Sequence, residues 1–292
     1  MDIIRLAADD YRPGSDLPYY DAYALHELYE RIAFKANSIL VGPKGIGKSL
    51  SVAAWGGKKN YPVITFDCSE DVRRAHLIGS FILKGDVSPF VLGPLTTAYE
   101  IANEVGHCIL VLEEVNALTP QMQKVLNAAS DFRNKIEVPE AERVFRLRDG
   151  AKLWIMGTMN TAVYGGVYQL NEDLKSRFRM LPLDYPNPEQ LMDIVTTASS
   201  ALPDPKTVKK VITLATEAQQ KEGLAYQLSP RDVVQILEDI TNVGLEDGLW
   251  MSSGKFEDMD RETYFRRIRS VFGNIKVNRF ESSDSTSTGI PF

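Results

Sequence analysis

The chain has 292 residues, of which 44% are hydrophobic and 25% charged, a composition that excludes wholesale disorder and a fibrous repeat. The net charge of −6, from 33 basic and 39 acidic residues, argues against a surface that covers nucleic acid. The longest apolar run spans residues 108–112, far below the roughly 18 residues of a membrane span. Because no charged-then-apolar leader opens the chain, we expect a cytoplasmic protein without a membrane partner.

The few cysteines and histidines limit the metal chemistry that is open to this chain. Cys68 and Cys108 lie in apolar, strand-like runs and are interpreted as small buried thiols. The three histidines are scattered without ligand spacing. Any bound metal is therefore expected to have oxygen ligands.

The first half of the chain alternates helices with short apolar runs. Apolar residues at the spacing of an amphipathic helix come first, within residues 20–34. Five strand-like apolar runs follow at 38–41, 63–66, 108–112, 153–157 and 180–183. Helices are expected at 48–55, ending at Gly56, at 94–106, and after a cap at Thr119. This alternation predicts an α/β fold with a parallel sheet between helices, whose ligands bind at the carboxyl ends of the strands.

Only helices are expected after Pro186. They are indicated at 188–199, 205–222, 230–243 and about 261–272. We therefore place an α/β domain at 1–186 and a small all-helical domain at 187–280. Residues 281–292 are expected to form a disordered tail, because residues 281–289 are of low complexity.

Residues 42–49 read GPKGIGKS, directly after a predicted strand and at the start of a predicted helix. This is the G-x-x-x-x-G-K-[ST] pattern of a phosphate-binding loop, typical of P-loop NTPases. Glycines let backbone N–H groups curl around a phosphate, while the lysine would neutralise the β and γ phosphates and the serine hydroxyl would bind Mg²⁺. Lys44 is interpreted as a solvated charge within the loop. The candidate nucleotide-binding residues are Gly42, Pro43, Lys44, Gly45, Ile46, Gly47, Lys48, Ser49 and Leu50.

Polar side chains end two further predicted strands. Glu113 and Glu114 follow the apolar run 108–112, and Asn160 follows the run 153–157. Because these strand ends share one rim with the loop, one glutamate would serve Mg²⁺ and the other would face an attacking water. Asn160 would orient that water from the other side.

Three segments then resemble the AAA+ ATPases, in particular the MoxR-like, McrB-like and dynein-related branch. Residues 113–120, EEVNALTP, are similar to that branch's D-E-I-N followed by a helix, and residues 157–160, GTMN, to its A-T-M-N sensor 1. Residues 76–79 with 93–95 are similar to the segment before its Walker B strand. The resemblance covers roughly residues 35–240.

The resemblance implies a role for each matching residue. Residues 42–49 would be Walker A, Glu113 and Glu114 would be Walker B with Glu114 catalytic, and Asn160 would be sensor 1. Arg177, in the segment LKSRF, would be an arginine finger that reaches the next subunit, and Arg231, in SPR, would be the sensor 2 arginine of a helical lid. Glu113 stands where the family usually has Asp, so the Mg²⁺ geometry carried by Ser49 and Glu113 departs from the family pattern.

Two hairpins are also indicated, at 80–92 and 136–147. They are either ordinary surface hairpins or, as in related rings, inserts that face a central pore or a partner.

The resemblance implies an ATPase that uses ATP and Mg²⁺, forms a ring, usually a hexamer, and remodels a protein client. Two alternatives stay open: a nucleic-acid-dependent motor or restriction-type component, with GTP as the alternative nucleotide, and a slowly hydrolysing, nucleotide-gated scaffold.

Overall fold

The structure is a computed structural model that describes residues 3–83, 88–131, 133–160, 168–220, 226–273 and 275–276. The chain divides into two compact units, Met1–Tyr185 and Pro186–Phe292. The expected tail at 281–292 lies outside the described residues, as does the expected end of the helix at 205–222. None of the described helices has the length and apolar character needed to cross a membrane.

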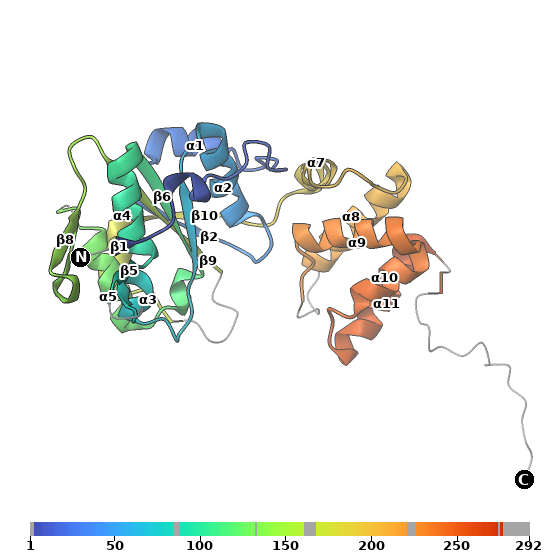
Figure 1. Cartoon of the computed structure of the whole chain (residues 1–292). Helices are drawn as coiled ribbons and strands as arrows, with labels where there is room; N and C mark the ends of the chain where they lie inside the picture. The colour runs from blue at the N-terminus through green and yellow to red at the C-terminus, as the bar shows by residue number, and fades with distance from the viewer. Residues whose placement is uncertain are drawn as a thin grey trace, which may run out of the picture. The chain divides into compact units, whose positions relative to one another are not determined.

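The first unit is built on a five-stranded parallel sheet in the order β10-β2-β9-β6-β3 (Figure 1). Its strands are β2 (Asn37–Val41), β3 (Val63–Asp67), β6 (His107–Glu113), β9 (Lys152–Met159) and β10 (Phe178–Pro182). The expected parallel sheet is therefore confirmed, and with it the α/β fold class.

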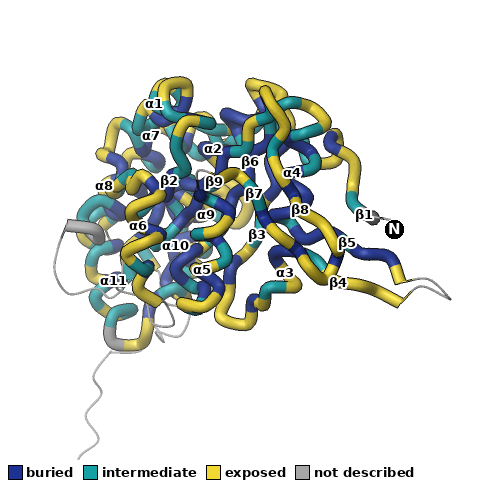
Figure 2. Tube along the Cα trace, turned by 90° about the vertical axis from the view of Figure 1, so that its left-hand side faces the viewer, coloured by how far each residue is buried: buried dark blue, intermediate teal, exposed yellow. Residues whose placement is uncertain are grey.

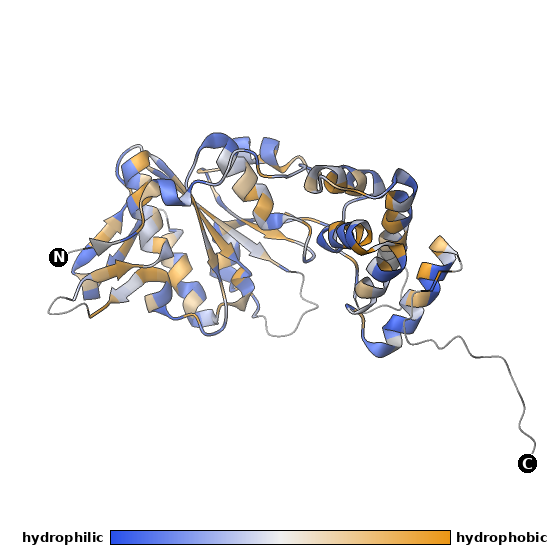
Figure 3. Ribbon diagram, turned by 45° about the vertical axis from the view of Figure 1, so that its right-hand side comes forward, coloured by the Kyte–Doolittle hydropathy of each residue, from blue (hydrophilic) through white to orange (hydrophobic). Residues whose placement is uncertain are grey.

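Helices cover both faces of this sheet. They are α1 (Leu25–Ile32), α2 (Lys48–Lys59), α3 (Arg74–Ile78), α4 (Pro94–Val105), α5 (Pro120–Ala129) and α6 (Glu172–Arg177). Along β6, Cys108, Leu110 and Leu112 belong to the core beneath α4, whereas Ile109 and Val111 belong to the core beneath α1 and α2. Burial on both faces explains why the central strands are almost continuously apolar, as the dark blue of Figure 2 and the orange of Figure 3 show.

Two small hairpins are attached to this layer. β4 (Gly79–Phe81) pairs with β5 (Phe90–Leu92), which also pairs with the short β1 (Ile3–Ile4). β7 (Lys135–Val138) pairs with β8 (Arg143–Arg146). Both hairpins expected from the sequence are confirmed.

The expected end of α2 at Gly56 is wrong, because this helix runs through Gly56 and Gly57 to Lys59. A Cβ at Gly56 would lie 2.5 Å from Cγ2 of Val63, and one at Gly57 would lie 2.3 Å from the carbonyl oxygen of Gly14. Glycine at these two positions therefore permits close packing instead of ending the helix. The left-handed cap is Asn60, with φ of 57°.

The second unit contains the helices α7 (Pro188–Ala198), α8 (Pro205–Gln220), α9 (Pro230–Val243), α10 (Leu245–Ser253) and α11 (Asp258–Phe272). They pack around their own apolar core, which includes Leu191, Val211, Leu237 and Tyr264. Helix α11 starts three residues earlier than expected, and α10 was not expected. The described part of this unit contains helices and no strand, in agreement with the all-helical expectation.

Candidate nucleotide-binding site

Three neighbouring strands bring the predicted site residues to one edge of the sheet. β9 lies between β2 and β6, and all three are parallel. The loop that begins at Gly42 follows β2, Asn160 follows β9, and Glu113 and Glu114 lie at the end of β6. Because parallel strands share their carboxyl edge, residues that are more than one hundred positions apart in sequence meet there.

The loop before α2 depends on its glycines for two different reasons. Gly45 and Gly47 have φ of 77° and 90°, which other residues rarely adopt. Gly42 is needed for space, because a Cβ there would lie 2.6 Å from the carbonyl oxygen of Leu183. Gly47 also precedes α2 without a side-chain cap, so the first N–H groups of this helix have no capping side chain.

Lys48 is almost completely buried at the first position of α2. Its Nζ donates to the carbonyl oxygens of Gly42 at 2.9 Å and Pro43 at 2.7 Å, and to Oδ1 of Asn160 at 3.0 Å. The lysine ammonium is thereby fixed in the mouth of the loop. Of the other loop residues, Ile46 is buried, Ser49 is half-buried, and Lys44 and Leu50 are exposed.

Asn160 connects the lysine to an acidic residue. While its Oδ1 accepts from Lys48, its Nδ2 donates to Oε1 of Glu114 at 3.1 Å. Glu114 has left-handed backbone geometry, with φ of 51°. This arrangement brings the ammonium, the amide and the carboxylate into one hydrogen-bonded chain.

The side chain of Thr158 contacts both glutamates, and no sequence pattern predicted this role. Its hydroxyl donates to Oε2 of Glu113 at 2.6 Å and accepts from the backbone N–H of Glu114 at 3.2 Å. Thr158 is buried on β9. Because Leu112 is paired with Gly157 in the sheet register, Thr158 lies beside Glu113.

Contacts from α1 support the start of α2, and no sequence pattern indicated them. The Tyr29 hydroxyl lies 2.8 Å from Oγ of Ser51, which donates to the carbonyl oxygen of Lys48 at 2.5 Å. His26 Nε2 lies 3.1 Å from the Ser51 carbonyl oxygen. These contacts fix the helix that carries the lysine.

The two cysteines are buried, as the sequence predicts, and neither forms a disulfide. Burial raises the pKa of the Cys68 thiol to about 12, and the nearby carboxylates of Glu113 and Asp67 act in the same direction. Burial also raises the pKa of Cys108 to about 12. Neither thiol therefore supplies a thiolate nucleophile near neutral pH.

Comparisons with known proteins identify the family of this chain. The sequence profile of the AAA domain (dynein-related subfamily) matches residues 37–178. The chain is 31% identical over 210 residues to the protein CbbQ of Hydrogenophilus thermoluteolus, covering 70% of this chain and 74% of CbbQ. The chain belongs to the dynein-related subfamily of AAA proteins.

Other matches to this AAA protein cover more of its length. An uncharacterised Staphylococcus aureus protein is 27% identical over 282 residues, covering 94% of this chain and all of its own. Among solved structures, a mutant of RuvB from Thermotoga maritima matches with a TM-score of 0.49 and 13% identity, covering 91% of this chain and 73% of the RuvB chain.

In this AAA protein, Arg177 forms no part of the hydrogen-bonded chain described above, among the interactions of the described residues. It ends α6 and is exposed, and its Nη1 lies 3.5 Å from Oδ2 of Asp131, just beyond α5. Asp131 also binds Arg133, and this hydrogen bond is the main reason that the pKa of Asp131 lies below its ordinary value. Arg177 does not contact the lysine, the asparagine or the two glutamates among the interactions of the described residues.

Arg231 belongs to the second unit, on the exposed side of α9. Ser229 caps this helix by accepting from the N–H of Asp232, and Pro230 occupies its first position, as expected. Burial alone would raise the pKa of Asp232, but hydrogen bonds from Lys255 and Ser229 lower it below its ordinary value. Arg231 therefore extends from a firmly capped helix.

Proposed function

We propose that this AAA protein hydrolyses ATP with the help of Mg²⁺. The hydrogen-bonded chain from Lys48 through Asn160 to Glu114 carries this proposal. It joins a phosphate-binding cation, a polar water-orienting group and a carboxylate base, which are the groups that phosphoryl transfer to water requires.

The loop fits a triphosphate. Left-handed glycines, the uncapped start of α2 and the fixed Nζ of Lys48 together offer several N–H donors and one positive charge. Such a combination favours phosphate oxygens, because the helix N-terminus adds its own partial positive charge.

The residues also fit Mg²⁺. The described residues contain no group of three His, Cys, Asp or Glu side chains that would form an all-protein cage. Mg²⁺ bound together with a nucleotide needs no such cage, since phosphate oxygens and water complete its shell. Ser49 and Glu113 would hold it, with Glu113 oriented by Thr158. When bound, the ion would neutralise charge on the β and γ phosphates.

Glu114 is the proposed general base. The Asn160 amide occupies one of its carboxylate oxygens, which leaves the other oxygen to accept a proton from the attacking water. Lys48 would stabilise the negative charge that develops on the γ-phosphate. Because Asn160 touches both residues, it would align the water with the bound phosphate.

We further propose that the chain works as a ring, expected to be a hexamer, that remodels a protein partner. Arg177 is exposed and separate from the site in its own chain, as an arginine finger that acts on a neighbouring subunit would be. Arg231 would contact the nucleotide from the second unit and transmit hydrolysis to that unit.

Replacement of Glu114 by Gln tests the central claim. The substitution keeps the hydrogen bond from Asn160 but removes the base, so we expect unchanged affinity for a fluorescent ATP analogue and loss of phosphate release. Glu142→Gln is a matched control, because Glu142 is also exposed and left-handed, with φ of 49°. Unchanged phosphate release in Glu114→Gln would refute the assignment. Stimulation of hydrolysis by DNA would favour the nucleic-acid motor instead.

A further inference from the structure

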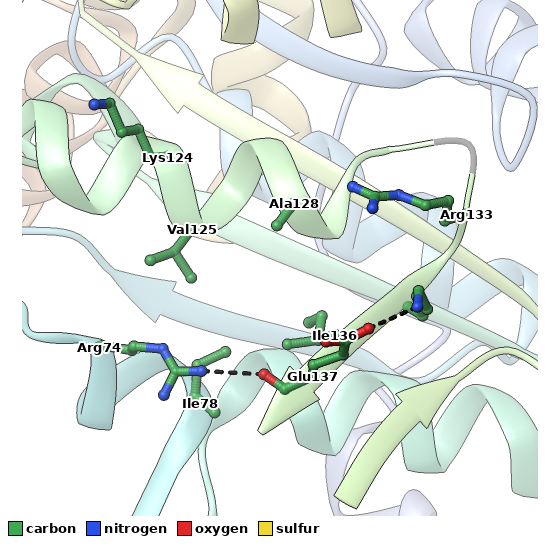
Figure 4. Close-up of a pocket in the computed structure, with 9 residues that line it drawn as sticks. Arg74, Ile78, Lys124, Val125, Ala128, Arg133, Ile136 and Glu137 are labelled. Carbon is green, nitrogen blue, oxygen red and sulfur yellow. Dashed lines mark hydrogen bonds and ion pairs between the residues drawn. The ribbon is translucent and has the colours of Figure 1, made fainter. Parts of the chain in front are cut away.

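A groove of about 370 Å³ lies in the first unit between α3, α5 and β7 (Figure 4). None of the candidate nucleotide-binding residues lines it. The groove is therefore a separate site, and its lining has to be explained by a different ligand.

The floor of the groove is aliphatic. Val125 and Ala128 point from α5 towards Ile136 and Ile78, as Figure 4 shows. Ile136 and Ile78 are buried, whereas Ala128 is exposed and Val125 half-buried. The apolar surface is thus available to a ligand with an aliphatic group of its own.

Basic residues outnumber acidic residues in the lining of the groove. Four basic residues and one acidic residue, Glu137, contribute to the lining; the basic residues are Arg74, Lys124, Arg133 and Lys135. Lys135 binds the Glu137 carboxylate at 2.6 Å, and Arg74 binds the Glu140 carboxylate at 2.5 Å. Lys124 is exposed and forms no ion pair or hydrogen bond within the described part of the chain.

These ion pairs would not prevent an anionic ligand from binding. The carboxylates of Glu137 and Glu140 are more than half exposed, and exposed ion pairs contribute little to stability. A ligand carboxylate can therefore pair with Lys124 first and compete for the neighbouring cations.

We propose that this groove binds an acidic segment of a partner protein, in which carboxylates flank an aliphatic side chain. The basic side chains of the lining would pair with the carboxylates, and the aliphatic floor would pack against the aliphatic side chain. A bare phosphate would leave the floor uncovered. A single-stranded nucleic acid would require aromatic side chains for base stacking, and none of the nine lining residues is aromatic.

The groove is also linked to Arg177. Arg133 donates to Asp131 from its backbone N–H at 3.1 Å and from its guanidinium at 3.2 and 3.3 Å. Arg177 shares the same carboxylate at 3.5 Å. A peptide carboxylate that pairs with the guanidinium of Arg133 would leave Oδ2 of Asp131 to Arg177 and hold that arginine within its own chain. The backbone N–H of Arg133 would keep its hydrogen bond to Oδ1. This link rests on the proposed function of Arg177, whereas peptide binding does not.

The test uses the full chain without nucleotide and a fluorescein-labelled octapeptide in which glutamates flank two leucines. Fluorescence anisotropy measures its Kd, and a second peptide carries glutamine in place of each glutamate. We expect saturable binding of the acidic peptide only. Lys124→Glu should raise its Kd about tenfold, because an attractive exposed contact becomes repulsive. Circular dichroism verifies that the variant is folded.

Lys209→Glu is the matched control, because Lys209 is exposed on a helix of the second unit and the charge change is identical. Its Kd should stay within about twofold of the unmodified chain. Equal loss of affinity for the acidic peptide in both variants, equal binding of the glutamine peptide, or tighter binding of oligodeoxythymidine through Lys124 would overturn the proposal.

A turnover assay tests the link to Arg177. Saturating peptide should slow ATP turnover in the unmodified chain but not in Lys124→Glu. Unchanged turnover with intact peptide binding would refute the link to Arg177.

Discussion

The hydroxyl of Thr158 donates a hydrogen bond of 2.6 Å to Oε2 of Glu113. The oxygen of the same hydroxyl accepts from the backbone N–H of Glu114. One buried hydroxyl on β9 therefore orients both acidic residues at the end of β6, and this makes Thr158 a positioning residue in the proposed site.

Thr158→Val keeps the shape of the side chain and removes both hydrogen bonds. We expect the free energy of unfolding to fall by about 1–3 kcal/mol, because buried polar partners lose their hydrogen bonds. The Mg²⁺ concentration at half-maximal ATP turnover should rise, since Glu113 is no longer held. Urea unfolding and a Mg²⁺ titration of turnover measure the two effects. Thr158→Ser retains the hydroxyl and should keep the Mg²⁺ requirement of the unmodified chain. An unchanged Mg²⁺ requirement in Thr158→Val would contradict this role.

Gly47→Ala places a side chain at φ of 90°. The expected cost is about 1–2 kcal/mol of stability, the usual penalty of left-handed backbone. Binding of a fluorescent ATP analogue should be lost, because the loop relaxes to another conformation. Gly150→Ala is a close control, since Gly150 has φ of 85° and open space around it. We expect similar destabilisation but normal nucleotide binding in this control; equal nucleotide affinity in both variants would disprove the role of the loop.

Arg177→Ala should lower ATP turnover by about 10³-fold or more while nucleotide affinity stays unchanged, the usual effect of losing an arginine finger. Lys175→Ala, on the exposed side of the same helix, should have little effect on ATP turnover.

Mixing Arg177→Ala with Lys48→Ala chains tests whether Arg177 acts on a neighbouring subunit. Lys48→Ala chains keep the arginine but lack the lysine of the phosphate loop. Turnover should therefore reappear in the mixture, and its absence at every ratio would argue against action on a neighbour.

Asp232→Asn should destabilise the second unit by about 1–3 kcal/mol at pH 7, since Asp232 is buried and bound by Lys255 and Ser229. The native pKa of Asp232 lies below its ordinary value. Its contribution is thus fully present above that ordinary value and is lost as the pH falls through the native pKa. Thermal unfolding between about pH 7 and pH 2 should show the difference between variant and parent disappearing in acid. Glu238→Gln, which removes the same charge from an exposed position of α9, should show no such trend.

Local sequence was sufficient for the elements that carry their own signals. Three helix caps lie where the sequence predicted them: the N-caps Thr119 and Ser229 and the left-handed C-cap Gly106. A cap can be predicted in this way because it depends only on its immediate neighbours. The apolar runs predicted the parallel strands, and the spacing of glycines, lysine and serine predicted the phosphate loop.

Other features follow from contacts between distant segments. Helices α3 and α6 have five and six residues, too few for a periodic apolar stripe to identify them. Gly56 was expected to end a helix, yet it lies inside α2 together with Gly57, and other segments pack directly against the backbone of both glycines.

The amino-acid sequence by itself determined the phosphate loop, the alternation of strands and helices, and the polar residues at the ends of two of the strands, because these depend on neighbours along the chain. Only the tertiary structure decided that Asn160 joins Lys48 to Glu114, that Thr158 holds Glu113, and that Asp131 holds both Arg133 and Arg177. The physical reason is strand order and register, which bring distant residues within hydrogen-bonding distance and leave no periodic pattern in the sequence.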